Sequence, residues 1–262
     1  MDKWVVHKFG GSSVADAGCF RRVAAIVEAS ANPREAVVLS ACRGVTDALL
    51  SLVSLAEQPG ADTAAAIDAL KARHYNLAAE LVSAPARAAY VAQLDQDCRD
   101  IAGMLQTVRL IRAAPQTMRD VISGYGEIWS TRLFGPFLRE RRHIAGDVLW
   151  VDAREVVIVE WGPLGPAVQW TTSERNLERL IPAGFEGRLI VTGFIATTAT
   201  GMQTTLGRNG SDFSGSIFGA LLHAAQIIIW TDVDGVLSAD PRLVPNAQVI
   251  DQLSYNEAME LA

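Results

Sequence analysis

The feature that most constrains the fold of this chain is a repeated alternation of short apolar runs with helix-like stretches. The run Ala36–Ala41 (A-V-V-L-S-A) is continuously apolar, which is typical of a strand buried on both faces of a sheet. Similar strands are predicted at Lys3–Phe9, Leu189–Val191 and Ile227–Trp230. Because a helical stretch separates the first two strands, we expect a βαβ unit and a largely parallel sheet.

The intervening stretches predict the helices. The first helix should begin at Ser12 or Ser13 as N-cap, with Asp16 in its first turn, and continue to about Ala31. Ala, Leu, Arg, Glu and Gln dominate from about 45 to 142, so we expect a helical excursion from the sheet there. The remaining expected elements are a strand at Asp147–Val151, a second strand signal at Val156–Val159, a helix at Ser173–Leu180, a hairpin within 195–206, and a helix from Ser211 or Asp212 to about Ala225.

Composition narrows the function classes. The 262 residues correspond to between one and two domains, and 50% hydrophobic residues suffice for a full core. A net charge of −6 argues against a protein that coats nucleic acid or an anionic membrane. Because neither a long apolar run nor a secretory signal is found, we expect a cytoplasmic protein without a membrane partner. Cys19, Cys42 and Cys98 are odd in number and widely spaced, so they are expected to be buried, reduced thiols.

The C-terminal residues predict a helix. Ser254 and Glu257 have the spacing of a capping box. The helix that they open would reach the last residue, Ala262, after about two turns. We therefore expect the chain to be a piece of a longer protein.

Small polar clusters follow the predicted strands, whereas the P-loop, Rossmann and H-E-x-x-H patterns are absent. Lys8 is close to the end of the first strand, and Gly10-Gly11 would let the backbone approach a ligand before a helix N-terminus. This arrangement suits a phosphate, although a tight turn with a solvated lysine would have the same sequence. Since open α/β sheets bind ligands at the carboxyl ends of their strands, we expect the clusters to converge.

The second cluster is Leu206–Asp212, L-G-R-N-G-S-D. Arg208 could hold a carboxylate through two hydrogen bonds. Asp212 could be a plain N-cap, or it could hold Lys8 or Mg²⁺. Acids and an arginine in Thr231–Gly235 and Ser238–Arg242 form a third cluster, which suits a nucleotide with Mg²⁺ or an Asp-Gly turn.

Two further segments are unusual for their predicted positions. Gly124-Tyr125-Gly126-Glu127 lies inside a helical stretch, where each glycine costs about 1 kcal/mol relative to alanine. Close packing or ligand approach would explain the glycines, and Glu127 would suit an ammonium group unless it is simply an exposed acid. Ser40–Thr46 is a strand-to-helix loop with small hydroxyl residues.

Taken together, these strings resemble the aspartokinases of the amino acid kinase family. The family order is followed by K-F-G-G-S-S-V, S-A-C-R-G-V-T, G-E, V-T-G-F, L-G-R-N-G-S-D, T-D-V-D-G-V and A-D-P-R. The residue after T-D-V-D-G-V differs from the usual pattern, because Leu237 stands where the family has tyrosine. The form of L-G-R-N-G-S-D is most similar to the kinase portions of bifunctional aspartokinases.

The resemblance implies a three-layer α/β/α sandwich around a mostly parallel sheet, with one amino acid kinase domain over 1–262, a substrate-side helical excursion at about 45–142, and a nucleotide-side lobe at about 206–262. It also implies transfer of a phosphoryl group from ATP, with Mg²⁺, to the β-carboxylate of L-aspartate in lysine, threonine and methionine biosynthesis. Further domains of the same polypeptide and a homodimer are implied too. The implied site residues are Lys8 and Asp212 for catalysis, Gly10, Gly11 and Ser12 for phosphate, Ser40, Thr46, Glu127, Arg208, Gly210 and Ser211 for aspartate, and Thr231, Asp232, Leu237 and Arg242 for the nucleotide.

Two other readings remain open. The chain could be another amino acid kinase, of the glutamate 5-kinase or acetylglutamate kinase type, although the long helical excursion with Gly126-Glu127 favours an aspartokinase. It could also be a non-catalytic fragment that only folds or dimerises. No catalytic base is required in the kinase readings, because a carboxylate is already a nucleophile at neutral pH.

Overall fold

The computed structural model describes residues 3–144, 146–163, 165–207, 210–231, 233–240 and 242–261. Residues up to Trp230 form one compact unit, and the residues from Thr231 onward form a second.

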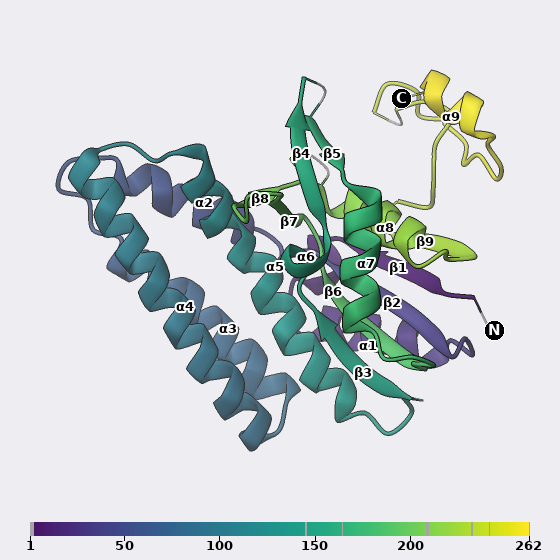
Figure 1. The fold of residues 1–262 in the computed structure, drawn as a ribbon, viewed down its shortest axis with the longest axis horizontal. Helices are drawn as coiled ribbons and strands as arrows, with labels where there is room; N and C mark the ends of the chain where they lie inside the picture. Colours follow the sequence, from purple (N-terminus) through teal and green to yellow (C-terminus); the bar gives the residue numbers. More distant parts are fainter. Residues whose placement is uncertain are drawn as a thin grey trace. The chain divides into compact units, whose positions relative to one another are not determined.

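A parallel sheet organises the first unit (Figure 1). Its strand order is β3-β6-β2-β1-β9, and every neighbouring pair is parallel. The strands are β1 (Val5–Phe9), β2 (Arg34–Leu39), β3 (Asp147–Val151), β6 (Gly187–Thr192) and β9 (Gln226–Trp230). The predicted strands are therefore confirmed, with ends that differ by a few residues.

Helices cover both faces of this sheet, as the fold class predicted. Phe9, Val37 and Leu39 pack in one core with α1 (Ala17–Ala29) and with the helices of the expected excursion. Val6, Val38 and Val191 point to the opposite face, where α7 (Trp170–Leu180) and α8 (Gly210–Leu221) cover them. The strands are apolar throughout because both faces are buried.

The expected excursion consists of α2 (Val45–Ala56), α3 (Ala64–Leu81), α4 (Ala84–Ile111) and α5 (Gln116–Arg139). In Figure 1, α5 lies between the sheet and the α3–α4 pair. No helix in the described part of the chain is long and apolar enough to cross a membrane.

A second, smaller sheet has the order β5-β4-β7-β8. It contains β4 (Ile158–Gly162), β5 (Gly165–Val168), β7 (Ile195–Thr198) and β8 (Gln203–Thr205). β7 and β8 pair antiparallel, which confirms the hairpin predicted within 195–206.

Three helices, α1, α8 and α7, begin at other residues than predicted. Asp16, not Ser12 or Ser13, is the N-cap of α1, because its carboxylate accepts the Cys19 N–H at 2.8 Å. Residues Gly11–Val14 instead form the 3₁₀ turn η1. The strand signal at Val156–Val159 is confirmed in part, because β4 begins at Ile158 after the short helix α6 (Ala153–Val156), which the side chain of Asp152 caps.

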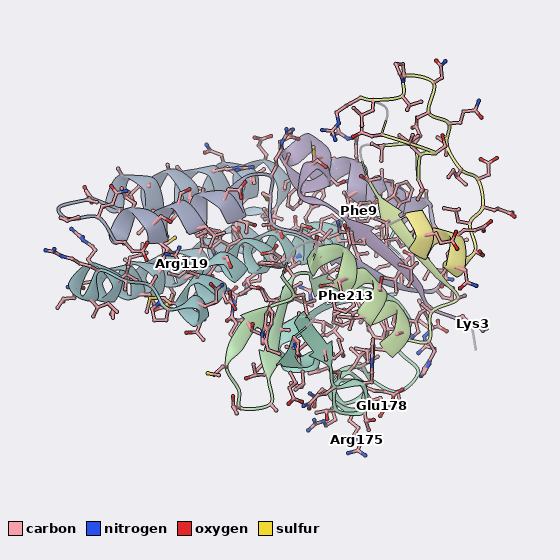
Figure 2. All side chains as sticks on the ribbon, turned by 90° about the horizontal axis from the view of Figure 1, so that it is seen from above. Lys3, Phe9, Arg119, Arg175, Glu178 and Phe213 are labelled. Atoms are coloured by element: carbon pink, nitrogen blue, oxygen red, sulfur yellow. The ribbon has the colours of Figure 1, made fainter. Side chains whose placement is uncertain are left out.

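The second such helix is α8, which begins at Gly210 and ends at Leu221 rather than about Ala225. Ser211 and Asp212 therefore lie in its first turn and do not cap it. Helix α7 begins three residues earlier than predicted, and its Arg175 and Glu178 point outward in Figure 2. The three cysteines are buried and unpaired within the described residues, as predicted.

The second unit contains the helix α9 (Tyr255–Leu261) and an antiparallel bridge between Leu237 and Val249. The capping box is confirmed, since the Ser254 hydroxyl donates to the Glu257 carboxylate at 2.7 Å and the Glu257 N–H donates back to that hydroxyl at 3.3 Å.

Candidate functional site at the strand ends

Lys8 supplies a buried cation at the carboxyl end of β1. Its side chain is only 7% exposed, and its ammonium forms an ion pair with the carboxylate of Asp212 on α8. A Cβ atom at Gly215 would lie 3.1 Å from the Lys8 Cβ atom, so helix α8 approaches the strand very closely at this point. The structure thus brings together the two residues predicted for catalysis.

The glycine turn after β1 packs against the loop that leaves β2. The Arg43 N–H donates to the Gly11 carbonyl at 3.0 Å, and a Cβ atom at Gly11 would lie only 2.9 Å from the Ala41 carbonyl oxygen. A Cβ atom at Gly10 would lie 3.5 Å from the Lys8 Nζ atom. A larger residue at position 11 would therefore separate the two loops, while Ser12 stays exposed at the surface of the turn.

Helix α5 approaches the same loop from the other side. A Cβ atom at Gly126 would lie 2.6 Å from the Ala41 Cβ atom, which explains the glycine inside this helix. The Ser130 hydroxyl donates to the Ser40 carbonyl at 2.7 Å. The contact places Glu127 beside the exit of β2.

Glu127 is a buried acid without a cationic partner among the described residues. It is 3% exposed, and its Oε2 atom has no hydrogen-bond partner in that part of the chain. Desolvation by burial raises the pKa of Glu127 to about 8, although a hydrogen bond with the Ala41 backbone lowers it in part. The carboxyl group is therefore largely protonated at neutral pH until a cation arrives, and the interpretation of Glu127 as an exposed acid is wrong.

The start of α8 lies beside the ends of β2 and β6. The Gly193 N–H donates to the Leu39 carbonyl at 2.9 Å, and a Cβ atom at Gly193 would lie 3.2 Å from the Ser211 Cβ atom. The Phe194 N–H donates to the Ser214 hydroxyl at 2.8 Å, and that hydroxyl donates to the Gly210 carbonyl at 2.9 Å. The first-turn N–H groups of α8 are therefore held at the same sheet edge as Lys8.

Gly215 and Ser214 are structurally important here but were not predicted as site residues. The sequence signal for Gly215 is the row of small residues Ser211, Gly215 and Gly219, which recur every four positions on one face of α8, whereas Ser214 has no such signal. Such a row allows a helix to lie close to a strand, and in this chain it brings Asp212 to Lys8.

Most of the other predicted residues lie outside the described part of the first unit. Thr46 is partly exposed in the first turn of α2. Arg208 and Asp232 lie outside the described residues. Thr231, Leu237 and Arg242 belong to the second unit, in which Arg242 is largely exposed and pairs with Asp240 at 2.7 Å. The nucleotide assignments of these residues therefore stay predictions.

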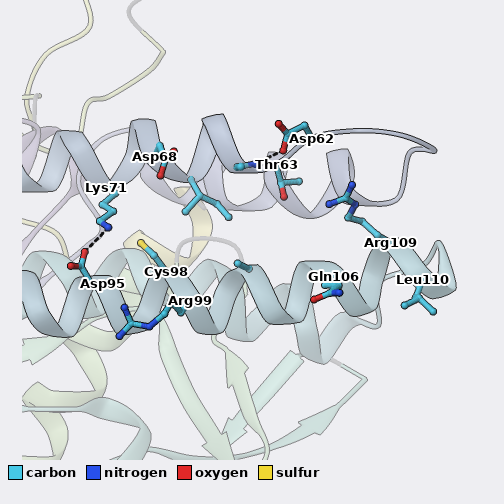
Figure 3. A pocket seen from close by; sticks show the side chains of 13 residues that line it. Asp62, Thr63, Asp68, Lys71, Asp95, Cys98, Arg99, Gln106, Arg109 and Leu110 are labelled. Atoms are coloured by element: carbon cyan, nitrogen blue, oxygen red, sulfur yellow. Dashed lines mark hydrogen bonds and ion pairs between the residues drawn. The ribbon is translucent and has the colours of Figure 1, made fainter.

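Among the described residues, no three His, Cys, Asp or Glu side chains gather closely enough to hold a metal ion. A hollow of about 700 Å³ lies between α3 and α4, far along the helical excursion, and is crossed by the Lys71–Asp95 ion pair at 2.7 Å (Figure 3). This hollow is therefore not part of the strand-end site, which consists of the Lys8–Asp212 pair and the loops that follow β1 and β2.

The pattern that describes the amino acid kinase family matches residues 3–262. The chain belongs to the amino acid kinase family. Its sequence is 37% identical to a chloroplastic bifunctional aspartokinase/homoserine dehydrogenase of Daucus carota, over 99% of the chain and 28% of that protein. It is 35% identical to the lysine-sensitive aspartokinase 3 of Escherichia coli, over 100% of the chain and 56% of that protein.

Solved structures agree with this family assignment. E. coli aspartokinase III in complex with aspartate and ADP superposes with a TM-score of 0.85 at 31% identity, covering 99% of this chain and 56% of that one. An aspartate kinase of Clostridium acetobutylicum gives a TM-score of 0.76 at 25% identity, over 98% of this chain and 54% of its own. This amino acid kinase chain therefore spans about half the length, or less, of the relatives that it matches.

Proposed function

We propose that this chain is the catalytic domain of an aspartate kinase, which transfers the γ-phosphoryl group of ATP to the β-carboxylate of L-aspartate. The observation that carries the proposal is the buried Lys8 ammonium, paired with Asp212 beside a glycine turn and a helix N-terminus. Relatives named as aspartokinases match the whole chain, and one of them was solved with aspartate and ADP.

The residues suit a reaction between two anions. A lysine ammonium about 4 Å from a phosphate oxygen gains about 4 kcal/mol at an effective dielectric constant of about 20, before desolvation is counted. Lys8 would stabilise the transferred phosphoryl group, and Asp212 would hold the lysine side chain in place. Gly10, Gly11 and Ser12 would offer contacts to the phosphates.

The amino acid would bind on the α5 side of Lys8. Glu127 has a free buried carboxyl oxygen, which suits the substrate ammonium. Ser40, Thr46, Gly210 and Ser211 would supply further polar contacts, and Arg208 would bind a carboxylate. Thr231, Asp232, Leu237 and Arg242 would bind the nucleotide.

The residues fit a metal ion that is brought by the nucleotide. Asp212 offers one half-exposed carboxylate, and the described residues contain no cage of acidic ligands. Mg²⁺ commonly binds through one or two carboxylates and the substrate phosphates. When bound, it would neutralise phosphate charge, with Asp212 as the nearest protein ligand.

The wider assignments follow from this proposal. The protein would act in the cytoplasm in the synthesis of lysine, threonine and methionine. It would carry further domains on the same polypeptide and assemble as a homodimer. The bifunctional relatives, of which this chain covers 28–31%, support the presence of further domains.

Trapping the acyl phosphate with hydroxylamine tests the proposed activity. We expect hydroxamate to form with aspartate and not with glutamate or N-acetylglutamate. The variant Lys8→Met should lower kcat by about 10²- to 10³-fold, whereas Lys71→Met, which removes an ammonium paired with Asp95 on the helical excursion, should leave kcat unchanged. Activity with glutamate or N-acetylglutamate alone would identify a different amino acid kinase.

A further inference from the structure

A groove between α4, α5 and β3 lies outside the proposed active site. Its volume is about 530 Å³, which is within the range of small-molecule sites. Ala86, Ala89 and Tyr90 line it from one face of α4, where the two alanines leave room. Trp150 of β3 lines it as well.

The groove combines an aromatic surface with cationic groups. The Arg132 guanidinium lies 5.3 Å from the centre of the Trp150 ring and pairs with Asp97 at 2.9 Å. The Arg139 guanidinium donates to the Val148 carbonyl at 2.8 and 3.1 Å and has no acidic partner among the described residues. An anionic group would therefore find an unpaired cation at Arg139.

Some of the other polar groups around the groove already form hydrogen bonds, and others are left to bond with a ligand. The Glu140 carboxylate accepts from the Ser83 N–H at 2.9 Å and from the Ser83 hydroxyl at 2.6 Å, at the start of α4. The buried Tyr90 hydroxyl has no partner among the described residues. Pro136, which also lines the groove, has no N–H to donate to the carbonyl of Arg132, one turn earlier on α5.

Hydrogen bonds connect the groove to the proposed substrate site. The Trp150 indole N–H donates to the Thr131 hydroxyl at 2.9 Å. That hydroxyl donates to the Glu127 carbonyl at 2.7 Å, one turn earlier on α5. A ligand on Trp150 would therefore lie two hydrogen bonds from the backbone of Glu127.

We propose that this groove binds a small aromatic carboxylate, with its ring against Trp150 and its carboxylate on Arg139, and that binding tightens the aspartate site through Thr131. The binding half stands on the groove alone. The coupling half rests on the proposed function, because it assumes that Glu127 holds the amino acid.

Indole-3-acetate and its neutral isostere indole-3-acetamide test the binding half. The indole ¹H–¹⁵N resonance of Trp150, assigned with Trp150→Phe, should shift saturably with indole-3-acetate. Indole-3-acetamide should bind at least about tenfold more weakly than indole-3-acetate. Arg139→Gln should lower the affinity for indole-3-acetate to that of the acetamide. Ala89→Phe should abolish binding of both, while Arg99→Gln, at an exposed arginine further along α4, should change nothing.

Contrary outcomes are distinct. Equal binding of the two probes would overturn the anionic class of ligand, and the absence of a saturable shift would overturn the site. If light scattering instead shows a dimer that Ala89→Phe dissociates, a second copy of the chain occupies the groove and the proposal is wrong.

The coupling half has a separate readout. Saturating indole-3-acetate should lower KM for aspartate in the wild type. It should leave KM unchanged in Thr131→Val, which keeps the shape of the side chain but cannot donate to Glu127. An unchanged KM in an active wild type that binds the probe would refute the coupling, whereas an inactive chain that still binds the probe would refute only the proposed function.

Discussion

Replacing Glu127 with glutamine should change how stability depends on pH. The carboxyl group has a pKa of about 8 in the folded chain, against 4.5 for an unshifted glutamate, because burial disfavours its charged form. Between these two values the folded state binds a proton that the unfolded state has released. The free energy of unfolding therefore falls as pH rises toward the folded pKa.

The size of this effect follows from the pKa difference. At about 1.36 kcal/mol for each pH unit, a rise from about pH 5 to about pH 8 should remove about 4 kcal/mol of wild-type stability through this residue. Typical domains have only about 5–15 kcal/mol in total, so the change is large enough to measure. Glu127→Gln cannot ionise and should lack this loss.

Urea denaturation of both proteins over this pH range measures the difference. The stability of Glu127→Gln relative to wild type should increase steadily with pH. Glu160→Gln, which changes an exposed acid on β4, is the control and should follow the wild-type profile. Parallel profiles for wild type and Glu127→Gln would refute the assignment of Glu127 as a neutral, buried acid.

Three further predictions concern packing, charge and thiol chemistry. Gly126→Ala should lower the free energy of unfolding by about 1–3 kcal/mol, because the new Cβ atom would lie 2.6 Å from the Ala41 Cβ atom at the exit of β2. The control Gly135→Ala, on the same helix, places its Cβ atom near no described atom beyond its own stretch of helix and should not be destabilising. Urea denaturation of both variants measures the difference. Arg188→Leu should cost about 3–5 kcal/mol, because it removes the guanidinium paired with the buried Glu35 carboxylate and leaves only the His7 imidazole beside it at 3.4 Å. Adding Glu35→Leu should restore part of that loss in the same assay. Burial raises the pKa of the Cys42 thiol to about 12, so almost no reactive thiolate is present at about pH 8. Mass spectrometry should therefore find Cys42 unmodified by iodoacetamide in the native chain and alkylated once urea is added. Rapid alkylation of Cys42 in the native chain would contradict this.

Much of the sheet could be predicted from the sequence because its strands are buried on both faces. Runs such as Ala36–Ala41 are apolar at successive positions, and this pattern indicates a buried strand whichever helices cover its two faces. Helix starts were harder to predict. Asp16 and Ser12 are both good N-cap residues, and only the tight packing of Gly11 against the loop after β2 decides that a 3₁₀ turn comes first.

Part of the site could be predicted for a similar reason. Lys8 lies near the carboxyl end of a parallel strand, where such sheets bind ligands, whereas Asp212 reaches it from the first turn of α8, which follows a strand of the second sheet. The burial of Glu127 could not be predicted from its helix, because it depends on how closely Gly126 lets α5 approach the distant residue Ala41. The groove at Trp150 is also set by tertiary packing, since its lining comes from α4, α5 and β3.

The central claim is that the strand-end site lets a carboxylate attack the γ-phosphorus of ATP. Aspartate labelled with ¹⁸O in its β-carboxylate tests this directly when Mg²⁺, ATP and hydroxylamine are present. Attack by the labelled oxygen forms the acyl phosphate and releases ADP, and hydroxylamine then displaces phosphate at the acyl carbon. The account predicts inorganic phosphate that carries one ¹⁸O atom together with β-aspartyl hydroxamate; phosphate without ¹⁸O would contradict it, because water would then be the acceptor.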